Sequence, residues 1–571
     1  TSSRPAAPPA VSRPKRGWNN KAGNKKTLRK PEKKDSHLAK RESFFAKRES
    51  FYGTFPNLCS ILFIKLFSFM RKILLLFVLL LVAIVSHAKE GMCDFIFQSG
   101  DIYYQVKDGN AWISRKAHYG YEDIVIWENN CYSGDIVIPE TLGGMKVVGI
   151  LKSAFDGSEN LTSVKIPSTV RIIEETAFDG TTKLSEITIP ASVESMGTYC
   201  LRNSGVKKVT IEDSATPLKL GDNGSNNFFG YKQTLLEEIY IGRDLVTLDG
   251  KEYSYLFHRN GTLREVTLGS NVTEISEKWF EYCDALEKVI ASSGLKKIGF
   301  RAFGACKAMK IFSGGQNVAE IAEEAFSSCQ SLQAFTIPST LKRIEKSTFY
   351  GCESLTELVV PNTVTHIVGK AFNYCSGIKK LIFEEGTSLI TLNLGSLEGV
   401  EELYVGRPYE DTVEGRSSFT FSTENLKKVT FGDNVNEIYY GDLSSSSLET
   451  VIIGKGLTKI DASTFWFSEN IKEIHLAATT PPVVGGGQHF SFVDTNTCKL
   501  LVPATSVDAY KSATAWKDFY NIESAGINDA KNESTIVIDS YSIDGQRTNS
   551  NHRGLTIQRT NDGKTRKVIV R

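Results

Sequence analysis

Ten cysteines give this chain its most conspicuous reactive side chains. Five of them follow one another at intervals of 23 residues: Cys283, Cys306, Cys329, Cys352 and Cys375. They lack the Cys-x-x-Cys spacing and the partnering histidines of a zinc site. A fixed interval would stack them in a row with parallel side-chain directions, which does not favour disulfides. The spacing therefore predicts a row of small, buried apolar side chains with free thiols.

The remaining chemistry-bearing residues form no catalytic pattern. The eight histidines are scattered singly, and no HExxH, GxSxG or phosphate-loop motif occurs. Gly485-Gly-Gly487 is not followed by the Lys-Ser/Thr of a phosphate-binding loop, so we interpret it as an ordinary loop. We assign no catalytic, cofactor-binding or metal-binding residue and predict a non-enzyme. A hydrolase whose carboxylates are brought together by folding is an alternative.

The cysteines belong to a longer repeat. With Leu332 as position 1, apolar residues occupy positions 4, 6, 10 and 13, phenylalanine occupies position 18 (Phe349) and cysteine occupies position 21 (Cys352). The first strand and turn lie near Ser133, and 14 further units begin at Leu161, Leu184, Val206, Leu236, Leu263, Leu286, Met309, Leu332, Leu355, Ile378, Val400, Leu426, Leu448 and Ile471.

Each unit predicts one coil of a stacked array. It opens with an apolar alternation typical of a short strand, and Pro or Gly then ends the strand. An Ala-Phe pair, such as Ala325-Phe326, predicts a tight turn that drives one ring into the core. A single coil cannot bury its own apolar face, whereas stacked coils bury it continuously. We therefore predict a β-rich solenoid of about 15 units of ~23 residues.

Both ends of the array need a cap. Before the repeats, Lys107-Asp-Gly-Asn between two alternating segments predicts a β-hairpin. After them, Thr505 is the expected N-cap of a single amphipathic helix that carries Tyr510, Trp516 and Phe519. A small β tail should follow, with turns at Asp544-Gly and Asp562-Gly.

These units resemble the BspA-type leucine-rich repeats of surface proteins. The pattern is Leu-x-x-hydrophobic-x-Ile-Pro-x-x-Val-x-x-Ile-x-x-x-Ala-Phe-x-x-Cys, and it covers about residues 133–500. The resemblance implies a right-handed curved solenoid that binds proteins at the cell surface. The last 35 residues are similar to the C-terminal sorting tails of type IX secretion, through Ile543-Asp-Gly, Gly554-Leu, Asp562-Gly and Lys567-Val-Ile-Val-Arg571. That similarity implies the secretion machinery as a partner, and a purely structural hairpin is the alternative.

Charge divides the chain into two parts. Residues 1–69 carry 16 Lys+Arg against 4 Asp+Glu, whereas residues 89–571 carry 49 against 61. An acidic array argues against nucleic acid as its partner. Met70-Arg-Lys, the apolar run Ile73 to Val85 and Ser86-His-Ala88 have the layout of a cleavable signal peptide, with an uncleaved anchor as the alternative. We therefore expect a secreted or cell-surface location, with no membrane span in the mature chain.

The domain boundaries follow from these features. We expect a basic disordered leader or non-native extension at 1–69, the signal peptide at 70–88, a β cap at 89–132, the solenoid at 133–500, a cap helix at 501–524, a linker at 525–535 and the β tail at 536–571.

Two surfaces of the array are candidates for binding an extracellular protein or glycan. The regular sheet side carries Glu/Lys neighbours on successive units (186/208, 265/288, 357/380 and 402/428), which we interpret mainly as relief of like-charge repulsion. The irregular units at 221–257 and 404–421 place aromatics beside Gly/Asn-rich loops, which suits recognition. The candidate contact residues are Phe228, Phe229, Tyr231, Tyr240, Tyr253, Tyr255, Tyr404 and Tyr409. A surface coat without a specific ligand is the alternative function.

Overall fold

The computed structural model describes most of the chain after residue 95. The described ranges are 96–119, 125–127, 132–221, 228–229, 235–252, 254–394, 396–411, 421, 423–439, 442–461, 463–485, 490–525, 537–542, 554–560 and 565–570. The predicted leader at 1–69 and signal peptide at 70–88 lie outside these residues, as do Tyr231 and Tyr253.

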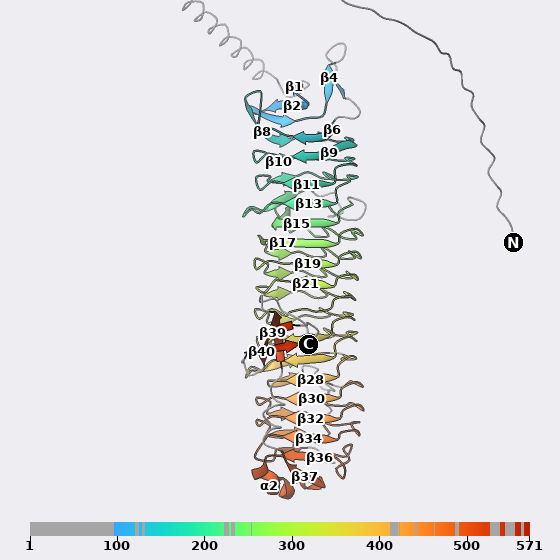
Figure 1. Cartoon of the computed structure of the whole chain (residues 1–571), viewed down its shortest axis with the longest axis vertical. Coiled ribbons are helices and arrows are strands. Elements are labelled where there is room, and N and C mark those ends of the chain that lie inside the picture. The colour runs from blue at the N-terminus through green and yellow to red at the C-terminus, as the bar shows by residue number, and fades with distance from the viewer. Residues whose placement is uncertain are drawn as a thin grey trace, which may run out of the picture. The chain divides into compact units, whose positions relative to one another are not determined.

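The repeats form a β-solenoid of about 16 turns of ~23 residues, which confirms the predicted fold class. Its main side is a ladder of parallel strands stacked one above another (Figure 1). These strands are β6 (Ser133–Val137), β9 (Asn160–Lys165), β11 (Glu186–Ile189), β13 (Lys208–Ile211), β15 (Glu238–Arg243), β17 (Glu265–Asn271), β19 (Lys288–Ile290), β21 (Ile311–Ser313), β24 (Glu357–Val360), β26 (Lys380–Phe383), β28 (Glu402–Val405), β30 (Lys428–Phe431), β32 (Thr450–Ile453), β34 (Glu473–Leu476), β36 (Lys499–Val502) and β37 (Asn521–Ser524).

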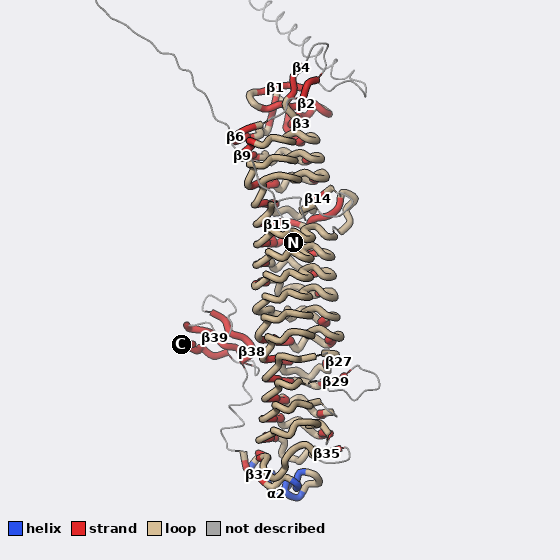
Figure 2. Tube along the Cα trace, turned by 90° about the vertical axis from the view of Figure 1, so that its right-hand side faces the viewer, coloured by secondary structure: helices blue, strands red, loops and turns tan. Residues whose placement is uncertain are grey.

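The second side of the coils carries shorter strands, and Figure 2 shows β14, β27, β29 and β35 opposite β15. They are β8 (Met145–Ile150), β10 (Ile172–Ile173), β12 (Ser195–Met196), β14 (Leu218–Leu220), β16 (Leu245–Thr247), β18 (Glu274–Ile275), β20 (Lys297–Ile298), β22 (Glu320–Ile321), β23 (Arg343–Ile344), β25 (His366–Ile367), β27 (Ile390–Leu392), β29 (Tyr409–Asp411), β31 (Glu437–Ile438), β33 (Lys459–Asp461) and β35 (Val483–Gly485).

Prolines make the turn between these two sides. The amides of Val193, Leu341 and Val364 donate to the carbonyls of Pro190, Pro338 and Pro361 at 3.0 Å, each three residues back. Proline has no amide to extend the ladder, so the strand ends there and the chain turns, as the repeat predicts.

The third side, which we call the turn side, consists of successive tight turns at positions 16 to 21 of each unit. Phe303 N donates to Ala325 O at 2.8 Å, and Phe326 N donates to Thr348 O at 2.9 Å, so backbone hydrogen bonds join neighbouring coils here too. Two residues of a typical turn have positive φ, such as Glu324 at 56° and Ser328 at 61°.

The core is a column of large side chains inside the coils. Phe303 stacks on Phe280 and Phe326 with ring centroids 5.2 and 5.3 Å apart, and the three rings are fully buried. This confirms that the Ala-Phe turn drives a ring into the core. Offset stacking of this kind adds about 0.5–1.5 kcal/mol per pair to the burial of the rings.

The five cysteines at position 21 are buried and free, as predicted. Their role is more than apolar packing, however, because each thiol donates a hydrogen bond to the carbonyl of the phenylalanine in the preceding coil. The Sγ–O distance is 3.0 Å from Cys306 to Phe280 and 3.2 Å from Cys329 to Phe303. The row is therefore a ladder of weak donors.

The predicted hairpin before the repeats is present. β1 (Ile96–Ser99), β2 (Ile102–Lys107) and β3 (Asn110–Ile113) are antiparallel neighbours, and Asp108 and Gly109 make the turn with φ of 54° and 71°. β3 then pairs in parallel with β8, which joins the hairpin to the second side of the solenoid. The remaining strands of this region are β4 (Ala117–Tyr119), β5 (Val125–Trp127) and β7 (Thr141–Leu142).

The far end differs in detail from the predicted single helix. α2 (Val507–Ser512) has only six residues, is preceded by the 3-10 turn η2 (Ala504–Ser506), and has Ser506 rather than Thr505 as its N-cap. The chain then leaves the helix through η3 (Trp516–Asp518) and adds β37 in parallel to β36. Hydrogen bonds from Tyr510 Oη to Ala478 O (2.9 Å) and from Trp516 Nε1 to Pro482 O (2.7 Å) explain the break, because both rings must reach the last coils.

The C-terminal segment forms a three-stranded antiparallel sheet. It consists of β38 (Val537–Ser542), β39 (Gly554–Thr560) and β40 (Thr565–Val570). This confirms the predicted small β tail. We refer to residues 537–570 as the tail module.

Candidate functional site

Four of the eight predicted contact residues are buried. Phe228 and Phe229 are 7% and 0% exposed, and Phe229 stacks on Phe257 at 5.1 Å. Tyr404 and Tyr409 are 3% and 2% exposed. The expectation that these side chains form an open contact surface is corrected by this burial. Phe229 continues the column of rings, and the Tyr409 hydroxyl bonds the buried carboxylate of Asp442.

The other described candidates, Tyr240 and Tyr255, are half-buried at the surface. The Tyr240 hydroxyl donates to Asp213 Oδ2 at 2.7 Å. Desolvation, and then the neighbouring Asp213 carboxylate, raise the pKa of Tyr240 to about 12. This tyrosine is therefore a neutral hydrogen-bonding group over the whole physiological range.

Two buried arginines accompany the irregular units, and sequence reasoning missed them. Arg243 donates to Pro190 O and Ala191 O at 3.0 and 3.1 Å, and Arg407 donates to Pro361 O and Asn362 O at 3.1 and 2.8 Å. Both are almost fully buried, and desolvation lowers the pKa of Arg407 to about 10.

A duplicated sequence motif could have predicted these two arginines. Tyr240-Ile-Gly-Arg243 and Tyr404-Val-Gly-Arg407 each follow two glutamates. At each site the tyrosine hydroxyl bonds a carboxylate, Asp213 or Glu385, in the preceding coil. The repeated arrangement is structural, because each guanidinium binds backbone carbonyls of the proline turn two coils earlier.

A group of half-buried aromatic and charged side chains, arranged around one buried carboxylate, lies on the turn side near Tyr255. It consists of Tyr255, His258, Lys278, Glu281, Tyr282 and Arg301, which we call the Tyr255 cluster. Tyr255, Lys278, Tyr282 and Arg301 have φ between 49° and 60°. These strained positions at the ends of successive turns aim side chains from three adjacent coils at one another.

One half of the Tyr255 cluster joins a cation to aromatic rings. Lys278 Nζ donates to Tyr255 Oη at 2.8 Å and lies 4.8 Å from the centre of that ring and 5.3 Å from the centre of Phe300. Its second partner is Glu277, at 2.9 Å. The hydrogen bond with Tyr255, opposed by desolvation and helped by Glu277, raises the pKa of Lys278. Cation–π contacts of this kind contribute about 0.5–2 kcal/mol each.

The other half is arranged around a buried carboxylate. The side chain of Glu281 is 4% exposed and lies 2.9 Å from Arg301 Nη1 and 3.3 Å from His258 Nδ1. Arg301 Nε also lies 3.2 Å from Glu324, which links a fourth coil. The His258 ring meets Tyr255 and Tyr282 edge-on, with centroids 5.4 and 5.8 Å apart. Each side chain is thus held by contacts from a neighbouring coil.

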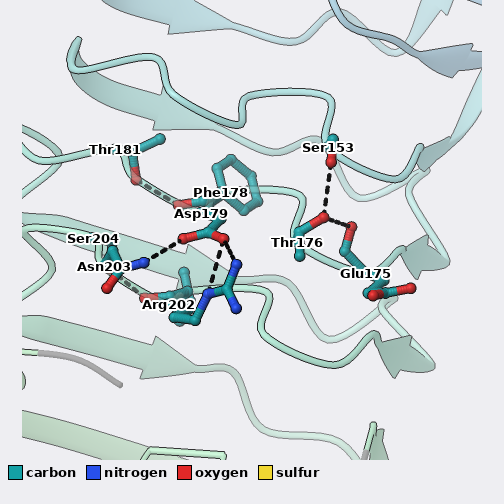
Figure 3. Close-up of polar contacts among 10 residues, drawn as sticks. Ser153, Glu175, Thr176, Phe178, Asp179, Thr181, Arg202, Asn203 and Ser204 are labelled. Atoms are coloured by element: carbon teal, nitrogen blue, oxygen red, sulfur yellow. Dashed lines mark hydrogen bonds and ion pairs between the residues drawn. The ribbon is translucent and has the colours of Figure 1, made fainter. Parts of the chain in front are cut away.

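A simpler version of this arrangement lies nearer the N-terminal cap. Figure 3 shows Asp179 between Arg202 and Asn203 of the next coil, with Asp179 Oδ2 2.9 Å from Arg202 Nε and Asp179 Oδ1 3.1 Å from Asn203 Nδ2. The hydrogen bond to Asp179 raises the pKa of Arg202, whose guanidinium also lies 4.6 Å from the Tyr199 ring. A buried turn carboxylate clamped by an arginine from the next coil is therefore a recurring feature of the turn side.

On the main side, the predicted charge neighbours lie in register. Glu186 is paired with Lys208, Glu265 with Lys288, Glu357 with Lys380, and Glu402 with Lys428. The second of these pairs forms an ion pair of 2.9 Å. Exposed pairs of this kind contribute at most about 1 kcal/mol. Because these pairs recur regularly, we interpret them as stabilising the stacking of the coils rather than as forming a distinct binding site.

Chemically, the Tyr255 cluster offers fixed rings and hydrogen-bond donors. Within the described ranges, no group of three or more His, Cys, Asp and Glu side chains could hold a metal ion. No helix in the same ranges is both long and apolar enough to cross a membrane. The arrangement suits noncovalent recognition.

Comparison with known proteins identifies the repeats. The family described as "BspA type Leucine rich repeat region (6 copies)" matches residues 148–286, 250–379 and 409–502, which together make up more than half of the chain. No curated protein matches.

Solved structures of leucine-rich repeat proteins also match. A T. pallidum leucine-rich repeat protein is 28% identical over 29% of this chain and 72% of its own, with a TM-score of 0.22. A leucine-rich cell surface protein from Faecalibacterium prausnitzii is 20% identical over 68% and 96%, with a TM-score of 0.28. A leucine-rich repeat protein from Bacteroides ovatus is 22% identical over 52% and 94%, with a TM-score of 0.19.

Proposed function

The chain belongs to the BspA-type leucine-rich repeat family, and on that premise we propose that it is an exported cell-surface protein that binds an extracellular protein or glycan without catalysis. Solenoids of this family are typically non-catalytic, and BspA-type proteins are cell-surface proteins. The signal-peptide pattern at 70–88 and the tail similar to a type IX sorting signal support export, with the secretion machinery as a second partner.

The observation that carries the binding proposal is the Tyr255 cluster. Aromatic rings provide large contact area with few rotatable bonds, and interface hot spots are rich in Tyr and Arg. In this cluster the rings of Tyr255 and Tyr282 are already fixed by Lys278 and His258, so less conformational entropy is lost on binding. Tyr240, on the main-side strand β15 of the same coil as Tyr255, is the second proposed contact residue.

Elsewhere on the solenoid, the regular ladder of coils keeps its repeat pattern. A binding site is expected where the repeat is irregular, because a uniform surface presents no unique position to a partner. The cluster begins in the long unit that opens at Leu236, which follows the unit with the polar insert at 221–227. The proposal therefore places recognition at this irregular unit and its two neighbours.

The test uses the full mature chain against immobilised surface glycans and extracellular proteins. Tyr255→Ala combined with Lys278→Ala should weaken binding to the identified probe at least tenfold. Tyr374→Ala is the matched control, because Tyr374 is a turn-side tyrosine with φ of 60° and 51% exposure four coils beyond Lys278. Equal affinity of the double variant and the control for every captured probe would contradict the proposed site.

A surface coat without a specific ligand is the second candidate, and the regular ion pairs favour it. Arg264 and Lys310 both contact Glu287, at 2.9 and 3.0 Å, and Lys379 and Lys427 both contact Glu401, at 3.3 and 2.7 Å. Such ladders stabilise a long array with no partner. Light scattering that shows self-association of the mature chain, together with no captured probe, would favour the coat.

A further inference from the structure

A second hydrophobic cluster lies on the outer side of the main sheet. Leu358, Leu381 and other inward residues of β24, β26 and β28 belong to the solenoid core. The residues that follow them along the strands point the opposite way. Val359, Ile382 and Tyr404 occupy these outward positions in register and form a separate cluster from the core. We call these three residues the outer patch.

The outer patch is buried although it faces away from the core. Val359, Ile382 and Tyr404 are 9%, 0% and 3% exposed. At the same repeat position, Ile290 on β19 and Ile452 on β32 are only half-buried, and Ser313 on β21 is exposed. Neighbours within one sheet cover the flanks of an outward side chain but not its tip. The lack of exposure therefore requires a covering segment.

The tail module is within reach of this patch. Twelve residues separate the end of β37 at Ser524 from the start of β38 at Val537. They can span at most ~40 Å when extended. In the sheet order, β37 is five strands from β28 and seven from β24. At ~4.8 Å per strand these separations are about 24 and 34 Å. The linker is therefore long enough for the module to lie over any strand of the patch.

The charges of the two parts are complementary. Residues 526–571 carry 8 Lys+Arg against 5 Asp+Glu, a net charge of +3, whereas residues 89–525 carry 41 against 56, a net charge of −15. The Tyr404 hydroxyl donates a hydrogen bond to the Glu385 carboxylate, and Asp433 is exposed on the next coil. A basic module thus meets an acidic solenoid, with carboxylates beside the patch.

We propose that the tail module docks on the outer patch of its own chain. The patch supplies the apolar contact, and the opposite net charges supply long-range attraction. The docked module covers β24, β26 and β28 on the main side, and removal of the tail uncovers this surface. Docking requires neither a binding role of the Tyr255 cluster nor a sorting role of the tail.

The experiment uses the full chain with a protease recognition sequence placed within residues 526–536. After cleavage at low salt, the module should co-elute with the solenoid in size-exclusion chromatography. Ile382→Asp should release it, with affinity weakened at least tenfold. Ile290→Asp, at the same repeat position on β19, is the matched control and should retain it. Release from the otherwise unchanged protein, or retention by Ile382→Asp, would overturn the proposal.

A second measurement guards against misfolding of the Ile382→Asp variant. Hydroxyl-radical labelling of Tyr404 in the cleaved, otherwise unchanged protein should rise severalfold once the module has been separated in high salt. Unchanged labelling would show that the module does not cover the patch. Light scattering of the intact chain should show monomers. Dimers that dissociate on tail cleavage would place the module on a second copy and contradict docking within one chain.

Discussion

Replacing Cys329 by serine should disturb the solenoid less than replacing it by alanine. The Cys329 thiol donates to Phe303 O at 3.2 Å. Other coils place conventional donors at the same position, and two of them bond the preceding coil at 2.6 Å, from Asn260 Nδ2 to Phe229 O and from Ser468 Oγ to Leu443 O. Serine at residue 329 therefore keeps a hydrogen bond that the fold already uses, whereas alanine removes it.

The expected energies distinguish a hydrogen-bonding role of Cys329 from purely apolar packing. Cys329→Ala loses one buried heavy atom and leaves a small cavity, which costs about 1–2 kcal/mol. In Cys329→Ser, the smaller oxygen packs less well, but its hydrogen bond restores about 0.5–1.5 kcal/mol. We expect the serine variant to lie within about 1 kcal/mol of the original protein. If no acceptor were available, burial of the hydroxyl would cost about 1–3 kcal/mol more.

The assay must report on individual coils, because long repeat arrays need not unfold in one step. Native-state hydrogen exchange of the amides around Phe326 and Phe349, which flank the substitution, gives local opening free energies. Cys498 is the matched control, because it is buried outside the row and its thiol is 3.8 Å from the Lys499 carbonyl. There serine should be worse than alanine. An opening free energy at least 1 kcal/mol lower for Cys329→Ser than for Cys329→Ala would refute the donor ladder.

Further predictions concern the core, the buried arginine and the thiols. Phe326→Ala should lower the local opening free energy of its coil by about 3–5 kcal/mol in native-state hydrogen exchange, whereas Phe467→Ala, at 55% exposure, should change that of its own coil by less than about 0.5 kcal/mol. Arg407→Met should cost about 1–3 kcal/mol, seen as a lower Tm, because carbonyls of the proline turn lose their donor; an unchanged Tm would contradict this. Burial raises the pKa of Cys200 and Cys375 from 9.0 to about 12, so the folded chain keeps protons that the unfolded chain releases. Their stabilisation should be complete below pH 9 and lost between about pH 9 and 12, and serine at both positions should flatten that decline in unfolding titrations at pH 8 and 10.

The period of the repeat was sufficient to predict the coil. Apolar residues at fixed positions and a turn at each proline determine which side chains face inward, as the buried rings of Phe303 and Phe326 show. The donor role of position 21 was harder to see, because cysteine also serves as a small apolar residue. Asn260 and Ser468 at that position in other units, both hydrogen-bond donors to the preceding coil, were an available signal.

The candidate site was less predictable, for two physical reasons. Insertions shift the repeat position of the residues after them, so position no longer predicts which side chains face inward. The sequence therefore predicts a surface pair at Phe228-Phe229, whereas in the structure the pair replaces an Ala-Phe turn and is buried. The Tyr255 cluster depends on positive φ at the turn ends, which brings residues such as Tyr255, Lys278 and Arg301 together from three coils. Such a contact between coils cannot be predicted from the residue spacing within one unit. The short cap helix has a similar cause, since Trp516 must reach the carbonyl of Pro482.

Mass spectrometry of the two ends of the native protein, isolated from its cells, tests the proposed export most directly. The first residue of the exported protein should be Lys89, immediately after the cut that follows Ala88. The proposed export also predicts that the protein is recovered from the cell surface or the medium. A native chain that retains residues upstream of Ala88 and is recovered only from the cell interior would contradict it.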